Sequence, residues 1–248
     1  MPKISAKNSI ILVNGYNYST YATQYDAVDN SGMVDVTCFT DGGQNFIPGL
    51  PNGQMTINFL ADATATVGTE AVFSAFPTGA VTLIPAGYTV GTNTISMPYM
   101  MGNYSPQGNP AGAVELGALT FAAYGSTFQG IEHGVALQHA TITATTTSTP
   151  VLDPTDDAVT AICGGTLHVW DICADDTYVV KVQHCATVGG AYADLITFVL
   201  DGSTLGVERQ VIASGVINKY RQVVATRTGA NAQTFGFTVH FWHGTDTT

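Results

Sequence analysis

The sequence predicts a mainly β protein, and three observations support this fold class. Apolar and polar residues alternate with a period of two in many short runs, which is the pattern of half-buried strands. Glycine, aspartate and asparagine recur between these runs, where they suit tight turns. Only residues 69–76 have the features of a helix. The 248 residues suffice for one large β domain or two smaller ones.

The first part of the chain carries eight candidate strands around that helix. They are predicted at residues 10–13, 25–28, 33–39, 54–60, 80–85, 94–100, 114–124 and 135–147. Turns are expected at residues 14–15 and 29–32. The helix begins at a hydroxyl residue, has an acid in its first turn and ends before Pro77. Val72, Phe73 and Phe76 would line one side and lie against a sheet.

The last third of the chain is β in character throughout. Its candidate strands are residues 166–172, 177–185, 193–200, 207–213, 219–226 and 234–242. Regular short strands of this kind predict a sandwich. Residues 149–158 contain two prolines and no aromatic residue, which is typical of a linker. The expected domains are therefore residues 1–148, a linker at 149–158, and a C-terminal β-sandwich at 159–248.

A predicted loop at residues 40–51 is rich in glycine and proline, yet it carries Phe46, Ile47 and Leu50. These apolar side chains have no regular element on which to be buried. The loop either folds under its own domain or packs into another subunit, and the sequence leaves both explanations open.

Charge is sparse and unevenly distributed along the chain. Charged residues make up 10% of the sequence, against about 25% in ordinary soluble domains. No Lys or Arg lies between Lys7 and Lys181, whereas acids recur from Asp26 to Asp176. The net charge of −11 argues against binding to phosphate backbones. The acids could repel DNA along a channel, or they could simply keep the protein soluble.

The four cysteines, Cys38, Cys163, Cys173 and Cys185, form no C-x-x-C pair. This spacing favours buried thiols in a reducing cytoplasm over disulfides or zinc. The apolar run at residues 10–13 is too short for a signal peptide, and no stretch approaches the ~20 apolar residues of a membrane span. Synthesis in the cytoplasm, with no membrane association, is the expectation.

Candidate catalytic residues are weak. His184 and Cys185 are neighbours in a predicted strand, so they would point to opposite faces and could not act as a pair. His240 and His243 would need two more ligands to hold a metal. Acidic pairs such as Asp175 and Asp176 suit turns, with calcium as an alternative. No nucleotide-binding or hydrolase motif occurs. The sequence predicts no enzyme, no metal site and no cofactor.

Tyr16, Tyr18 and Tyr21 lie close together and could stack on sugar rings or bases. Without basic residues nearby, nucleic acid is disfavoured. The alternative function is therefore a carbohydrate-binding or adhesive β-sandwich module on a virion or cell surface. Packing between sheets or subunits is the other explanation of these aromatic residues.

Several strand and turn segments resemble the major tail tube proteins of long-tailed, non-contractile bacteriophages (siphovirus type). The segments in the first part are residues 11–21, 35–41, 46–50 and 54–59. Those in the second part, which resemble one subgroup, are residues 175–184, 194–198 and 220–224. Together they are spread over most of the chain.

This resemblance implies a tail-tube-like β-sandwich or barrel with one short flanking helix. It implies a structural virion protein that polymerises into stacked rings, forming an acidic channel through which genomic DNA passes without specific binding. The rings would be hexameric, or trimeric with pseudo-hexameric symmetry if a weak similarity between residues 20–42 and 177–202 reflects duplication. Other partners would be the tape measure, terminator and distal tail proteins. The protein would be assembled in the host cytoplasm and located in the virion tail.

The resemblance also assigns roles to single residues and to the C-terminal domain. The assembly loop would contain Phe39, Asp41, Phe46, Ile47 and Leu50. The candidate channel-lining acids are Asp26, Asp29, Asp35 and Glu115. The C-terminal sandwich would be an outer decoration or a second tube-like domain.

Overall fold

A computed structural model gives the fold of the chain. It describes residues 8–35, 46–62, 68–75, 77–104, 107–108, 114–124, 130–231 and 233–244. At residues 29–35, 46–52, 107–108, 114–117, 154–159 and 213–214 it describes the backbone only.

The prediction of a mainly β fold is confirmed, because strands dominate the chain and pair in antiparallel fashion. The described elements are β1 (Ile10–Val13), β2 (Tyr16–Asn17), β3 (Ala22–Asp35), β4 (Phe46–Leu60), α1 (Thr69–Phe73), β5 (Thr78–Ile84), β6 (Asn93–Met101), β7 (Gln107–Gly108), β8 (Val114–Ala123), β9 (Glu132–Ile142), β10 (Thr146–Thr147), β11 (Val151–Asp171), β12 (Thr177–Cys185), β13 (Ala193–Thr197), β14 (Gly206–Thr228) and β15 (Phe235–His243).

The chain forms two compact units that interleave along the sequence. Unit 1 comprises residues 1–20, 79–96 and 132–248, and unit 2 comprises residues 21–78 and 97–131. The sequence had instead suggested consecutive domains with a linker at residues 149–158. In the structure most of that segment belongs to β11, whose pairing with β14 shifts register between Leu152 and Asp157. Pro154 lies within this shift, where a missing N–H donor is tolerated.

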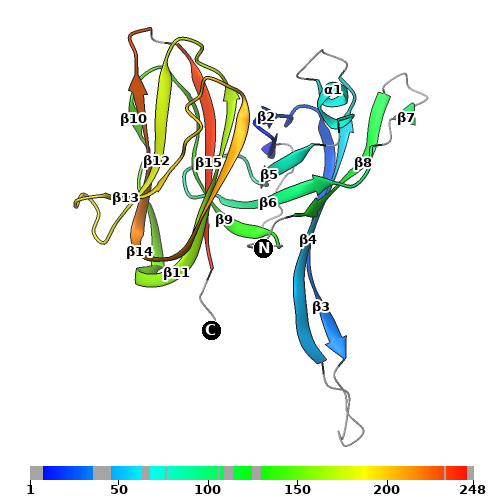
Figure 1. The fold of residues 1–248 in the computed structure, drawn as a ribbon, viewed down its shortest axis with the longest axis horizontal. Helices are drawn as coiled ribbons and strands as arrows, with labels where there is room; N and C mark the ends of the chain where they lie inside the picture. The colour runs from blue at the N-terminus through cyan, green and yellow to red at the C-terminus, as the bar shows by residue number, and fades with distance from the viewer. Residues whose placement is uncertain are drawn as a thin grey trace, which may run out of the picture. The chain divides into compact units, whose positions relative to one another are not determined.

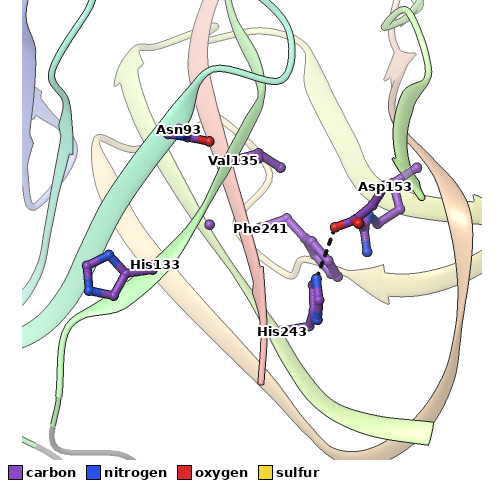
Figure 2. Close-up of a pocket in the computed structure, with 8 residues that line it drawn as sticks. Asn93, His133, Val135, Asp153, Phe241 and His243 are labelled. Atoms are coloured by element: carbon purple, nitrogen blue, oxygen red, sulfur yellow. Dashed lines mark hydrogen bonds and ion pairs between the residues drawn. The ribbon is translucent and has the colours of Figure 1, made fainter. Parts of the chain in front are cut away.

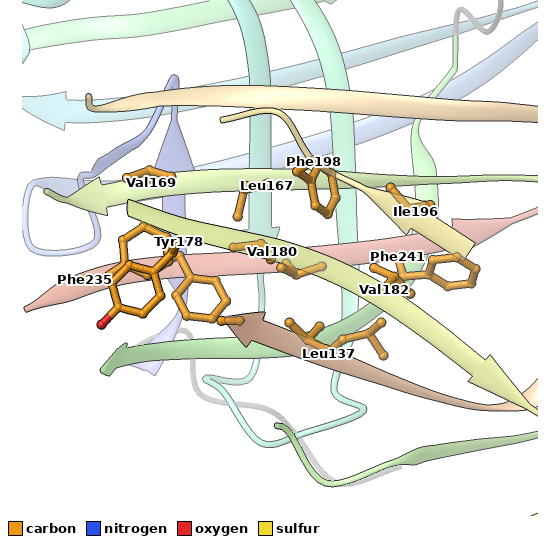
Figure 3. Packing of buried hydrophobic residues seen from close by; sticks show 14 of the residues in the cluster. Leu137, Leu167, Val169, Tyr178, Val180, Val182, Ile196, Phe198, Phe235 and Phe241 are labelled. Atoms are coloured by element: carbon orange, nitrogen blue, oxygen red, sulfur yellow. The ribbon is translucent and has the colours of Figure 1, made fainter. Parts of the chain in front are cut away.

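Unit 1 is a curled sheet with the strand order β13-β12-β14-β11-β15-β9-β6-β5-β1-β2. Its hydrophobic core lies where β12 and β13 pack on β11, β15 and β9 (Figure 3). Tyr178, Phe235 and Phe237 form a stack in this core, with ring centroids 4.5 and 4.8 Å apart. Such pairs add about 0.5–1.5 kcal/mol beyond the area they bury.

Residues 163–169 of β11 and almost all of β15 are buried, whichever face of the sheet their side chains occupy. Leu167 and Val239 point into the hydrophobic core. On the other face, Thr166, His168 and His240 are equally buried and meet hydroxyl groups of β5 and β6. The face of β11 and β15 that points away from the hydrophobic core therefore forms a buried polar interface with β5 and β6, held by hydrogen bonds.

His168 organises this polar interface. The backbone N–H of Gly15 donates to its Nδ1 over 3.3 Å, so the ring proton resides on Nε2 and is donated to Thr82 Oγ1 over 2.8 Å. Thr82 Oγ1 lies 2.9 Å from Ser96 Oγ. Gly15 can reach the imidazole because Asn14 and Gly15 both have positive φ, as a two-residue hairpin turn between β1 and β2 requires.

Unit 2 is built on β4, which pairs with β3 on one side and β8 on the other. The helix α1 covers this sheet through Phe73, whose ring lies 5.0 Å from Phe59 and 6.0 Å from Phe121. The predicted helix is thus confirmed, although it ends at Phe73. Its first residue, Thr69, binds the end of β4: Oγ1 donates to Leu60 O and accepts from Asp62 N.

Candidate functional site

The most distinctive feature of unit 2 is a long β-hairpin. β3 and β4 pair from Ala22↔Phe59 to Asp35↔Phe46. β8 pairs with β4 only from Gln54 to Leu60. Beyond that point the described strands form a two-stranded ribbon that runs past the end of β8 (Figure 1). Residues 46–53 give this ribbon a reach of roughly 25 Å at about 3.3 Å per residue.

The ribbon corrects the prediction of a loop at residues 46–51 and of a break between strands at 25–28 and 33–35; the rest of the predicted loop and strand, residues 36–45, lies outside the described residues. Phe46, Ile47 and Leu50 belong to β4, and the expected turn at residues 29–32 lies inside β3. Pro48 and Pro51 had suggested a loop. They are accommodated because this part of β4 has a described partner on one side only, and because the pairing shifts register between Ser31 and Met33.

The outer edge of β3 is the second feature of this site. Among the described residues β3 pairs with β4 alone, so one side of a 14-residue strand has no strand partner there. Thr23, Gln24 and Asp26 are exposed along it, and Val28 is 48% exposed. A long edge strand is a template on which another chain can add a strand.

The predicted site residues fall into three groups. Phe39 and Asp41 lie outside the described residues. Asp26 is exposed in β3 and borders a hollow of about 220 Å³ together with Tyr25 and Asn58. For the others the backbone alone is described: Asp29, Asp35, Phe46, Ile47, Leu50 and Glu115. Three of the four candidate channel acids therefore share β3 (Asp26, Asp29 and Asp35), whereas Glu115 is in β8 opposite Leu60.

The histidines considered as catalytic or metal-binding groups have other partners. His184 Nδ1 accepts from the backbone N–H of Asn218 over 3.2 Å, and Cys185 is buried. His240 contacts Thr94 inside the polar interface, whereas His243 pairs with Asp153. No cluster of three or more potential metal ligands occurs within the part of the chain that the structure describes.

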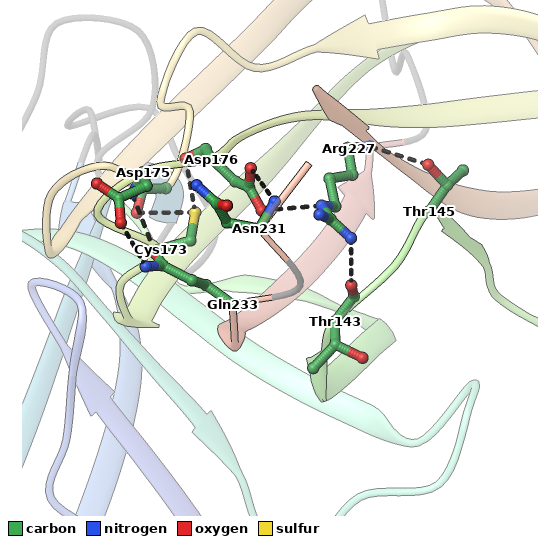
Figure 4. A network of polar contacts seen from close by, with 9 residues as sticks. Thr143, Thr145, Cys173, Asp175, Asp176, Arg227, Asn231 and Gln233 are labelled. Atoms are coloured by element: carbon green, nitrogen blue, oxygen red, sulfur yellow. Dashed lines mark hydrogen bonds and ion pairs between the residues drawn. The ribbon is translucent and has the colours of Figure 1, made fainter. Parts of the chain in front are cut away.

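Asp175 and Asp176 lie in a turn and have different environments (Figure 4). Asp175 is exposed and exchanges hydrogen bonds with Gln233. Asp176 is buried, accepts from Arg227 Nε over 2.9 Å and accepts from the backbone N–H of Asn231. Arg227 in turn donates to the Thr143 carbonyl. The pair therefore holds a turn in place, as the sequence suggested.

The tyrosines proposed as a stacking surface are only partly available. Tyr18 is 2% exposed and stacks on Tyr16 with centroids 5.7 Å apart. Tyr21 belongs to unit 2. Because Tyr18 is covered, it cannot present a ring face to a ligand.

The described cysteines, Cys163, Cys173 and Cys185, are buried and carry reduced thiols, while Cys38 lies outside the described residues. The one helix found among the described residues, α1, is far too short to cross a membrane.

Comparison with known proteins adds little to this picture. No family model matches the sequence, and no curated protein matches it either. Among solved structures, the chain is similar to the Dit protein of phage SPP1, described as a hub of the adsorption apparatus in phages that infect Gram-positive bacteria. The match covers 95% of this chain and 99% of that one, at 10% identity and a TM-score of 0.35. Likeness at this level carries no argument about function.

The sequence pointed to the segment that contains the hairpin but missed its form. The two features of the candidate site, the ribbon and the outer edge of β3, depend on which strands pair. The sequence analysis missed them because β3 and β4 continue through glycine, proline and asparagine residues that are typical of turns.

Proposed function

We propose that this protein is a structural subunit of a phage tail that polymerises through unit 2 into stacked rings, forming a tail tube. The proposal rests on the ribbon of β3 and β4 beyond β8. An isolated two-stranded ribbon is marginally stable in water. This one carries Phe46, Ile47 and Leu50 in its sequence, so a neighbouring subunit that covers the ribbon would bury apolar residues and stabilise it.

The edge of β3 provides a route to ring closure. A neighbour that adds its own strand along β3 would extend the sheet from subunit to subunit, since backbone groups give affinity without any special side chain. A ring of such contacts removes every open edge. The low charge content of the chain agrees with a protein whose flanks are covered by copies of itself.

Acidic residues on β3 would give the wall of the proposed channel a negative charge. With Asp26 exposed on that strand and a net charge of −11, the inner wall of such a ring would repel DNA and let it pass without binding. In this proposal the partners are the chain itself and other tail proteins, such as tape measure, terminator and distal tail proteins. The site of action is the virion, after assembly in the host cytoplasm.

The test is assembly of the purified full chain, followed by negative-stain electron microscopy and sedimentation at rising protein concentration. We expect tubes of uniform width from the wild type. Phe46→Asp places a carboxylate on the ribbon and should abolish tubes while the monomer keeps its circular dichroism and melting temperature.

The matched control is Val188→Asp, which adds the same charge at a site that is 66% exposed between β12 and β13. It should assemble as the wild type does. Tubes of normal length from Phe46→Asp, or monodisperse monomers from the wild type at every concentration and salt, would show that the ribbon does not drive polymerisation.

A further inference from the structure

Unit 1 contains a half-open pocket of about 330 Å³ that none of the features above uses (Figure 2). This volume lies within the range of about 300–1,000 Å³ that is typical of small-molecule sites. Residues from five strands line it: Asn93, His133, Gly134, Val135, Asp153, Arg221, Phe241 and His243.

The inner wall of the pocket is formed by an ion pair between Arg221 and Asp153. Arg221 is only 1% exposed, and its Nη2 donates to Asp153 Oδ2 over 2.8 Å. Its guanidinium also lies over the Phe241 ring, 4.9 Å from the centroid. His243 Nε2 lies 3.2 Å from the same Asp153 oxygen. Held by these contacts, the carboxylate and the guanidinium are ordered before any ligand arrives.

The outer rim is polar and accessible. Asn93 and His133 are exposed, and Figure 2 shows them across the pocket from Asp153 and His243. Val135 adds an apolar side chain to the lining of the pocket. The pocket thus has an amide and an imidazole at its mouth and an ion pair in its depth.

Charge selects the class of ligand. The opposite charges of Asp153 and Arg221 cancel. An anion in the pocket would be repelled by the carboxylate, and a cation would be repelled by the guanidinium. A neutral polyhydroxyl ligand avoids both conflicts, because each hydroxyl group can donate to Asp153 and accept from Arg221.

Stability alone does not account for this wall, since apolar residues can often replace a buried ion pair without loss. We propose that the pocket binds a neutral saccharide, with inner hydroxyls on Asp153 and Arg221 and outer hydroxyls on Asn93 and His133.

The experiment is saturation-transfer difference NMR on the full chain with methyl glycosides of glucose, galactose, N-acetylglucosamine and rhamnose, with glucuronate and inorganic phosphate as charged probes. We expect signal from at least one neutral glycoside and none from the charged probes. The NMR measurement uses unassembled protein. Its result is therefore independent of whether the protein can form tubes.

Two variants locate the binding. Asn93→Trp fills the mouth from an exposed rim position and should abolish the signal while the fold is retained. Asp153→Asn should weaken affinity about tenfold or more, because it removes a charged acceptor. Val179→Trp, at an exposed position of β12 outside the pocket, is the matched control and should bind as the wild type does.

Three outcomes would overturn the proposal: no signal from any neutral glycoside, equal or stronger signal from glucuronate or phosphate, and a glycoside signal that Asn93→Trp leaves intact.

Discussion

Replacing Asp176 by alanine is expected to destabilise unit 1 by about 3–5 kcal/mol, the usual cost of removing one partner from a buried ion pair. The Arg227 side chain, which is only 14% exposed, would lose its carboxylate partner, and the backbone N–H of Asn231 would lose its acceptor. The closeness of this network leaves little room for rearrangement: a side chain on Gly229 would come within 1.9 Å of Asp176 Oδ1. Urea unfolding of the variant and the wild type measures the difference.

The neighbouring acid is the matched control. Asp175 is exposed and exchanges hydrogen bonds with Gln233, so Asp175→Ala should cost no more than about 1 kcal/mol. In the double variant Asp176→Ala/Arg227→Met, the loss should be smaller than the sum of the single losses, because no uncompensated charge remains. Equal effects of Asp175→Ala and Asp176→Ala would contradict the buried role of Asp176.

Acid should destabilise the protein well above the pH at which most carboxylates are protonated, because of two buried histidines. Burial lowers the pKa of His168 and of His240 from 6.5 to about 3. Between these values the unfolded chain binds protons that the folded chain excludes, so stability falls as pH drops. Each histidine contributes up to about 1.4 kcal/mol per pH unit in that window. Above about pH 6.5 both histidines are neutral in the folded and the unfolded chain, so they add no further pH dependence to the stability.

The measurement is the free energy of unfolding from about pH 7 to about pH 4 for the wild type and His168→Gln. Glutamine retains an acceptor and a donor but does not titrate, so the variant should lose about half of the histidine-dependent slope, even if it is less stable at neutral pH. His133→Gln replaces an exposed histidine and serves as the control. The idea would be rejected if the wild type and His168→Gln had parallel pH dependences.

Sequence reasoning was most successful where strands were short and bounded by tight turns. The strands β1 and β12 have the predicted bounds, and α1 lies where its apolar side predicted. It failed where a strand passes through residues that normally end strands. β4 continues through Pro48 and β14 continues through Gly215, next to register shifts that absorb the irregularity.

Burial was the other limit of the sequence. The alternation in β15 is typical of a strand with one face in water, yet its polar residues are buried as well, and His240 contacts Thr94 of β6. No local pattern distinguishes a threonine or histidine that meets solvent from one that meets another sheet. The pocket around Asp153 was missed for a related reason, because its residues come from strands more than a hundred positions apart and only topology brings them together.

The two prolines of β4 make the projecting arm chemically one-sided. Along its outer margin, Pro48 and Pro51 withhold amide hydrogens, whereas β3 has no proline between Ala22 and Asp35. Strand addition is therefore open along one margin and interrupted along the other. The interrupted margin disfavours margin-to-margin stacking of copies of this arm into a cross-β fibre.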